Sequence, residues 1–291
     1  MPFREGTVTA QDGKRLYYRD YGPRVGSPVP AVCLGGLTRN SADFHRVASR
    51  LSRDGRRVVC PDYRGRGRSD YDRDWRNYAP KGLVYDLTVM LTALDIGAVV
   101  AIGTSLGGLL AMGLAAARPT AVKGALLNDV GPELNLAGAE RVRDYVSEDR
   151  VHRDWDSAVA DLKTMMPDIS VPDPKEENWL RIARTTWRRG EDGLLHYDFD
   201  LNVARTLIDP NEVPDLWPLF RALGRVPVAV VRGADSDLLL PATVERMAAA
   251  RGGDLIAATV PGVGHAPNLD EPESREAIDA LLARVDGAAG D

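Results

Sequence analysis

The stretch AVVAIGTSLGGLLAMGLAAAR, residues 98–118, is the clearest indication of the fold of this chain. Its first part, Ala98–Ile102, is apolar at every position, as a central strand must be when helices cover both faces of a parallel sheet. Its last part, Leu106–Arg118, is rich in small apolar residues and predicts a helix that lies close to the sheet. Between them, Gly103–Gly107 has the pattern G-x-S-x-G. The stretch therefore predicts a strand, a sharp turn and a helix in succession.

The segments around this stretch alternate between expected strands and expected helices. An Asp12-Gly13 pair joins the first two strands and predicts a hairpin. The two strands of the hairpin are Thr7–Ala10 and Arg15–Tyr21. The other expected strands are Ala31–Leu34, Arg57–Cys60, Val122–Asn128, Val226–Arg232 and Asp254–Val260. The expected helices are Ser41–Arg53, Pro80–Leu94, Pro241–Arg251 and Pro272–Val285. This alternation predicts an α/β fold with a mostly parallel, doubly wound sheet.

The alternation is interrupted once, after the sixth strand of the series. Residues 133–222 are rich in charged residues and have helical character with no clear strand. We expect residues 1–132 and 223–291 to form the core domain and residues 133–222 to form a helical cap inserted in it. In open α/β sheets, ligands bind at the carboxyl edge of the strands, so a cap at this edge would cover the binding site.

Ser105 stands at the centre of the G-x-S-x-G turn and is the expected nucleophile. A serine that projects clear of a sheet must occupy a sharp turn with a strained backbone. Side chains two residues before and after it would crowd that turn, and the glycines at 103 and 107 remove them. The first turn of the following helix would direct free N–H groups and its dipole toward developing negative charge.

From about Phe3 to Val285, the chain resembles the α/β-hydrolase superfamily. The resemblance rests on the serine turn, on Asp62–Ser69, which is similar to the D-x-R-G-x-G-x-S loop of that superfamily, and on the stretches GLTRN, GTSLGGLLAM and LNDVGP. It is greatest for small cap-bearing hydrolases such as 3-oxoadipate enol-lactonases, carboxylesterases and hydrolases of carbon–carbon bonds. The resemblance implies the α/β-hydrolase fold and a Ser-His-Asp triad. Ser105 argues against the activities of those relatives whose nucleophile is an aspartate.

His265 is the expected general base. The chain has four histidines, and His265 alone lies in a loop after a late expected strand, in the order nucleophile, acid, histidine that is typical of this fold. His45 lies in an expected surface helix, and His152 and His196 lie in the charged insertion.

The triad acid should follow the strand Val226–Arg232, where Asp235 and Asp237 stand. Relatives commonly carry the acid four residues before a proline that opens the next helix, and Asp237 has this spacing to Pro241. We therefore expect Asp237 to be the acid, with Asp235 as the alternative. Asp129, after the preceding strand, is a third option, because some relatives take the acid from there. Ser236 holds the place of the usual acid, which is a departure from the family pattern.

The oxyanion hole is expected to use two backbone amides, those of Leu37 and Leu106. Leu106 directly follows the nucleophile, and Leu37 lies in the loop after the strand Ala31–Leu34. Gly35-Gly36 would allow a close approach of the backbone, although many relatives carry His-Gly before the oxyanion residue. Each such donor typically stabilises a transition state by about 3 kcal/mol.

Composition narrows the possible partners. The 291 residues carry a net charge of −5, which argues against a nucleic-acid partner. No run is long and apolar enough for a membrane span, and the N-terminus lacks an apolar signal core. Cys33 and Cys60 lie in apolar runs and are expected to be buried, reduced thiols, which favours a cytoplasmic location. No histidine, cysteine or carboxylate cluster has metal-ligand spacing, so we expect neither a metal nor an organic cofactor. The oligomeric state is not predicted.

The favoured function is hydrolysis of a small-molecule ester or lactone through an acyl-enzyme. The alternatives are hydrolysis of a carbon–carbon bond, for which Arg39 or Arg64 would have to hold carboxylates, acyl transfer or perhydrolysis, and a ligand-binding receptor. We also expect at least one tryptophan of the insertion to line the pocket and to favour acyl groups of modest size. The candidates are Trp155, Trp179, Trp187 and Trp217.

Overall fold

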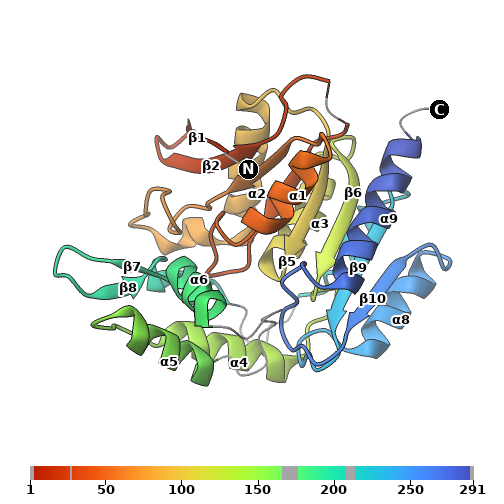
Figure 1. Ribbon diagram of the computed structural model, residues 1–291. Helices are drawn as coiled ribbons and strands as arrows, with labels where there is room; N and C mark the ends of the chain where they lie inside the picture. Colours follow the sequence, from red (N-terminus) through yellow and green to blue (C-terminus); the bar gives the residue numbers. More distant parts are fainter. Residues whose placement is uncertain (1–2, 27, 166–175, 208–213, 289–291) are drawn as a thin grey trace.

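The chain forms a mostly parallel sheet of eight strands in the order β1-β2-β4-β3-β5-β6-β9-β10 (Figure 1). The computed structural model describes residues 3–26, 28–165, 176–207 and 214–288. Strand β2 runs antiparallel to β1 and β4, and the other neighbouring strands pair in parallel. The strands are β1 Arg4–Thr9, β2 Arg15–Tyr21, β3 Ala31–Leu34, β4 Val58–Pro61, β5 Val99–Thr104, β6 Val122–Asn128, β9 Val228–Gly233 and β10 Ile256–Val260.

Helices cover both faces of this sheet, which confirms the doubly wound arrangement. Apolar side chains of α2, α3, α7 and α8 pack with one face, and those of α1 and α9 pack with the other. The helices of these two layers are α1 His45–Arg53, α2 Pro80–Ala93, α3 Leu106–Ala117, α7 Trp217–Arg221, α8 Pro241–Ala250 and α9 Pro272–Ala288, and a short 3-10 helix, η1, spans Trp75–Tyr78. Helix α1 begins four residues later than expected because residues 41–44 form turns.

The segment between β6 and β9 lies beyond the end of the sheet where β5 meets α3 (Figure 1), and its helices α5 and α6 pack against each other. Its elements are α4 Leu136–Ser147, α5 Trp155–Met165, α6 Glu176–Thr186, β7 Trp187–Arg189, β8 Leu195–Tyr197 and the 3-10 helix η2 Leu201–Thr206. Strands β7 and β8 form an antiparallel hairpin. The expectation of no strand in this segment is therefore wrong, because three-residue strands are too short to show a periodicity.

This segment has a small apolar core of its own. Trp187 is almost fully buried and stacks on Tyr197 with 5.4 Å between the ring centroids. Residues of α5, α6 and the hairpin pack around the pair. The segment is therefore held together by its own aromatic side chains, and hydrogen bonds such as that from the backbone N–H of Gly67 to the carbonyl of Asp198 join it to core loops.

Two further expectations concern cysteines and membrane spans. Cys33 and Cys60 are both buried and free, as expected. Burial raises the pKa of the Cys60 thiol, so that the neutral form is favoured.

Within the described ranges, no helix combines the length and the apolar character that crossing a bilayer would require.

Candidate active site

Ser105 lies at the sharp turn between β5 and α3 that the sequence predicts. Its φ of 51° and ψ of −118° are unusual for a residue other than glycine, which is the strain expected of an exposed nucleophile. A Cβ atom on Gly103 would lie 2.3 Å from the carbonyl carbon of Gly107. A Cβ atom on Gly107 would lie 2.0 Å from the carbonyl oxygen of Leu34. The turn is therefore sterically closed to any residue but glycine at both positions.

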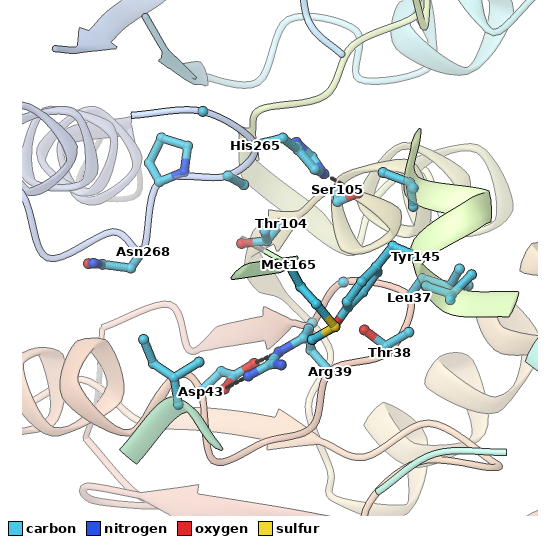
Figure 2. A pocket seen from close by; sticks show the side chains of 18 of the residues that line it. Leu37, Thr38, Arg39, Asp43, Thr104, Ser105, Tyr145, Met165, His265 and Asn268 are labelled. Carbon is cyan, nitrogen blue, oxygen red and sulfur yellow. Dashed lines mark hydrogen bonds and ion pairs between the residues drawn. The ribbon is translucent and has the colours of Figure 1, made fainter. Parts of the chain in front are cut away.

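His265 lies in the loop after β10, and its imidazole faces Ser105 (Figure 2). The Nε2 atom is 3.0 Å from the Oγ atom of Ser105, within hydrogen-bond distance. The imidazole is largely buried, with 10% of its side chain exposed. The structure thus brings together the two residues that the sequence singled out as nucleophile and base.

The carboxylate beside His265 belongs to Asp129, at the end of β6. Its Oδ2 atom lies 2.7 Å from Nδ1 of His265, and the side chain has no exposed surface. Its Oδ1 atom accepts a hydrogen bond of 3.0 Å from the backbone N–H of Gly233. Ser105, His265 and Asp129 thus form a continuous hydrogen-bonded chain, the arrangement that activates serine in acyl-transfer enzymes.

The predicted pairing of Asp237 with His265 is wrong. The Asp237 carboxylate instead accepts two hydrogen bonds of 2.7 Å from Arg141 on α4. These bonds, rather than burial, dominate its electrostatics, and they lower the pKa of Asp237. The alternative Asp235 is exposed at the same loop and, within the described chain, forms no hydrogen bond with the imidazole either. Asp129, the third option, is the residue in place.

The physical reason lies in the neighbouring residue Ser236. Strands β6 and β9 are adjacent, so groups at their carboxyl ends reach the same point above the sheet. The Ser236 hydroxyl donates a 2.6 Å hydrogen bond to Oδ2 of Asp129. A small hydroxyl at the place of the usual acid leaves room for a carboxylate from β6, and it also stabilises that carboxylate. The sequence carried a signal for this exchange. A serine stands at the place of the usual acid, and an aspartate, Asp129, directly follows the strand that pairs with β9.

A further residue that sequence reasoning missed is Asn128, which anchors the histidine loop. Its Nδ2 group donates a 2.7 Å hydrogen bond to the carbonyl of Pro267 and a 2.9 Å hydrogen bond to the hydroxyl of Thr104. Asn128 is fully buried. It therefore ties the loop that carries His265 to the end of β5, close to the nucleophile.

Leu37 and Leu106, the two residues expected to form the oxyanion hole, lie at the pocket and directly beside the nucleophile. Leu37 lines the pocket in front of Ser105, and Leu106 is the first residue of α3. Neither N–H group donates a hydrogen bond to another residue in the part of the chain that the structure describes. The Leu37 loop is held from behind, because buried Arg66 donates from Nε to the Leu37 carbonyl at 2.8 Å.

A cavity of about 570 Å³ opens in front of Ser105, within the usual size range of small-molecule sites. Core loops and the segment between β6 and β9 both contribute to its wall. Figure 2 shows Tyr145 and Met165 reaching toward the side of the pocket opposite His265. Apolar groups of the segment that line the pocket are Val142, Tyr145, Val146, Met165 and Ile182.

The expectation that a tryptophan lines this pocket is wrong. None of the four tryptophans is among the residues of the wall within the described chain. Trp187 is buried in the small core of the segment, with Trp155 and Trp179 packed against that core. Trp217 packs against the main core, and its indole N–H donates to Glu133 at 2.8 Å.

Arg39 and Arg64 are both paired. Arg39 lines the pocket, and its guanidinium forms two hydrogen bonds of 2.5 Å and 2.8 Å with Asp43 (Figure 2). It also donates to the hydroxyl groups of Thr185 and Thr186, each at 2.7 Å. Arg64 is buried away from the pocket wall and pairs with three carboxylates, those of Asp12, Asp72 and Asp86. Neither arginine therefore has a free charge for a substrate carboxylate.

In the part of the chain that the structure describes, no three histidine, cysteine or acidic side chains gather closely enough to hold a metal ion. The residues around Ser105 are a hydroxyl, an imidazole and a carboxylate in one hydrogen-bonded line, which is the donor set of nucleophilic catalysis.

Comparisons with known proteins agree with this architecture. Residues 31–277 match the model of the alpha/beta hydrolase family. The chain is 39% identical over 265 residues to a 3-hydroxybutyrate-oligomer hydrolase of Cupriavidus necator, with 89% of each protein covered. It is 31% identical to Lipase LipV of Mycobacterium tuberculosis, covering 80% of this chain and 86% of that protein. Among solved structures, an alpha/beta hydrolase from Novosphingobium aromaticivorans superimposes with a TM-score of 0.89 at 43% identity, covering 97% of this chain and 98% of that one. The chain, with a nucleophile turn of this geometry and matches along most of its length, belongs to the α/β hydrolase family.

Proposed function

We propose that this protein is a serine hydrolase that cleaves a small-molecule ester or lactone through an acyl-enzyme. Ser105 is the nucleophile, His265 the general base and Asp129 the residue that orients the imidazole. The observation that carries the proposal is the chain of hydrogen bonds, 3.0 Å from Ser105 to His265 and 2.7 Å from His265 to Asp129. Its members come from three separate loops at one edge of the sheet, as the family mechanism requires.

In the first step, Oγ of Ser105 attacks the carbonyl carbon of the substrate. Nε2 of His265 accepts the hydroxyl proton, and the buried Asp129 carboxylate keeps a proton on Nδ1 and stabilises the imidazolium. The imidazolium then gives its proton to the leaving alkoxide, and the acyl group remains on Ser105. A water molecule attacks the acyl-enzyme in the same way and releases the acid.

The negative charge on the attacked oxygen would be bound by the amides of Leu37 and Leu106. Both amides lie at the cavity or directly beside the nucleophile, and both lack an acceptor within the described chain. The backbone passes close to the nucleophile here, since a Cβ atom on Gly36 would lie 3.9 Å from the Cβ atom of Ser105, in ordinary van der Waals contact. Preorganised amides in a site shielded from water contribute without reorganisation during the reaction.

The segment of residues 133–222 is proposed to act as a cap on a core formed by residues 1–132 and 223–291. It supplies the apolar wall of the cavity, and its polar contacts to the core include Arg39 to Thr185 and Thr186. A cavity of about 570 Å³ with such a wall supports acyl groups of modest size over long lipid chains. The two buried thiols fit the reducing cytoplasm as the place of action.

An ester is favoured over a lactone or a carbon–carbon bond. The relative from Cupriavidus necator, at 39% identity, is named for hydrolysis of 3-hydroxybutyrate oligomers, which are held together by ester bonds, and the relative at 31% identity is named a lipase. The pocket arginine Arg39, which a carbon–carbon hydrolase would need for carboxylates, is already paired with Asp43. Short esters of hydroxy acids are therefore the first substrates to test.

The experiment combines covalent labelling with turnover. Purified protein is treated with a fluorophosphonate probe and assayed on 4-nitrophenyl acetate, butyrate and decanoate and on a small lactone. We expect labelling of wild-type protein, none of Ser105→Ala, and the highest turnover on the short esters. Ser147→Ala is the matched control, because this serine is exposed on α4 outside the pocket wall. Labelled or active Ser105→Ala would contradict the nucleophile assignment, and unlabelled wild type would point to a receptor.

A further inference from the structure

Three arginines line the cavity, and two of them are already paired. Arg39 is bound by Asp43 through two hydrogen bonds, and Arg141 is bound by Asp237 through two more. A carboxylate that accepts two hydrogen bonds from a guanidinium largely compensates its positive charge. The third arginine of the wall is Arg181, on α6 of the segment between β6 and β9.

The guanidinium of Arg181 has no partner among the residues that the structure describes. Its Nε–H group is buried and meets no hydrogen-bond acceptor there. Burial and the neighbouring cation Arg46 both lower the pKa of Arg181. Arginine nevertheless stays protonated in proteins, so this side chain carries a full positive charge at the pocket wall.

Two carboxylates, those of Asp43 and Asp270, act electrostatically on Arg181. Both are hydrogen-bonded to other arginines. Asp43 is bound by Arg39, and Asp270 accepts hydrogen bonds from Arg46 at 3.1 Å and from Arg275 at 2.6 Å. Both carboxylates still raise the pKa of Arg181, but the hydrogen bonds that they accept come from other arginines.

A cation that has no hydrogen-bonded counter-ion in a partly apolar cavity raises the free energy of the protein, and binding of an anion there would offset this cost. The wall beside it includes Met165 and Ile182, which lower the local polarity and strengthen any ion pair that forms there. A carboxylate matches the planar fork of a guanidinium, which can donate two parallel hydrogen bonds to it. Asp235, the remaining carboxylate of the wall, is exposed, so solvent screens its charge.

We propose that Arg181 binds a carboxylate of the substrate, and that the site therefore selects esters that carry a free acid group, such as linear esters of hydroxy acids with an ionised end. This inference rests on the proposed ester hydrolysis at Ser105 and identifies the substrate class for that site. Arg181 is a specificity-determining residue that acts on binding and takes no part in the proton transfers.

The test compares two substrates that differ only in charge: the linear ester dimer of 3-hydroxybutyrate as free acid, and the same dimer with its terminal carboxyl as primary amide. Wild-type protein is expected to prefer the acid, mainly through a lower KM. Arg181→Gln should lower kcat/KM for the acid by about thirtyfold or more, since removal of one partner of a buried charge pair has effects of this size. The same variant should change kcat/KM for the amide by less than about threefold. Arg181→Lys should restore part of the preference, because it keeps the charge and loses the fork.

Arg184→Gln is the matched control, because Arg184 lies on the same helix, is exposed and is not part of the pocket wall. Equal losses on acid and amide in Arg181→Gln would show a structural role and overturn the inference. Turnover of 4-nitrophenyl acetate reports whether the variant is folded. If the variant does not fold, wild-type protein decides: equal kcat/KM for acid and amide, or equal inhibition by butyrate and butyramide, overturns the inference. Failure of wild type to cleave any of these esters would instead refute the proposed function.

Discussion

Replacing Asp129 by asparagine changes one atom in the centre of the hydrogen-bonded chain and keeps its shape. In the structure, Oδ1 of Asp129 accepts from the backbone N–H of Gly233, while Oδ2 accepts from Ser236 and from Nδ1 of His265. An asparagine that keeps its oxygen on Gly233 must direct its NH2 group at His265. The imidazole must then accept at Nδ1 and carry its proton on Nε2, where it cannot take the proton of Ser105.

The size of the effect follows from this wrong tautomer. The equivalent substitution in a serine protease lowers kcat about 10⁴-fold, which corresponds to about 5 kcal/mol of transition-state stabilisation. Asp237→Asn is the matched control, because its partner Arg141 is about half exposed and a surface pair of this kind contributes little. We therefore expect Asp237→Asn to change kcat by less than about tenfold.

The assay is kcat on 4-nitrophenyl butyrate for wild type and both variants, with circular dichroism to show that each variant is folded. If Asp237→Asn is the more damaging change, or if Asp129→Asn retains activity within about tenfold of wild type, the geometric argument for Asp129 is refuted.

Three further predictions address stability and cofactor use. Gly107→Ala should lower the free energy of unfolding by about 3 kcal/mol or more, because the new Cβ atom would lie 2.0 Å from the Leu34 carbonyl, whereas Gly97→Ala, with open space around it, should change it little; equal effects in urea unfolding would contradict the steric argument. Burial raises the pKa of Asp198 to about 6, so the folded state favours the protonated carboxyl group. The free energy of unfolding of wild type therefore falls as the pH rises from about 4 to about 6. Asp198→Asn, which can still accept from Asn40, should therefore be more stable than wild type by about 3 kcal/mol near pH 8 and by little near pH 4, and a difference independent of pH would refute this. Ester hydrolysis should be unchanged by EDTA, and loss of activity that a divalent ion restores would show a metal requirement that we do not expect.

The parts of this molecule that short-range sterics control could be predicted from the sequence. The turn at Ser105 is an example, because glycines at 103 and 107 are the only residues that the backbone there admits. The sheet is another, because runs that are apolar at every position can only be buried between two layers of helices. His265 was identifiable because only one histidine followed a late strand.

The acid of the site depended on the tertiary structure. Asp129, Asp235 and Asp237 all follow strands that end at the same edge, so their place in the sequence cannot rank them. Which carboxylate reaches His265 is decided by the pairing of β6 with β9, by the small hydroxyl of Ser236 and by the capture of Asp237 by Arg141.

The segment between β6 and β9 and the pocket that it lines also depended on tertiary packing. The hairpin of β7 and β8 consists of two three-residue strands, and its tryptophan is buried against Tyr197 and not in the cavity. Arg39 and Arg181 are indistinguishable as sequence letters, yet one is paired with Asp43 and the other faces the pocket without a partner among the described residues. Pairing between groups far apart in the chain is set by how helices pack over the sheet, and no local pattern of residues contains that information.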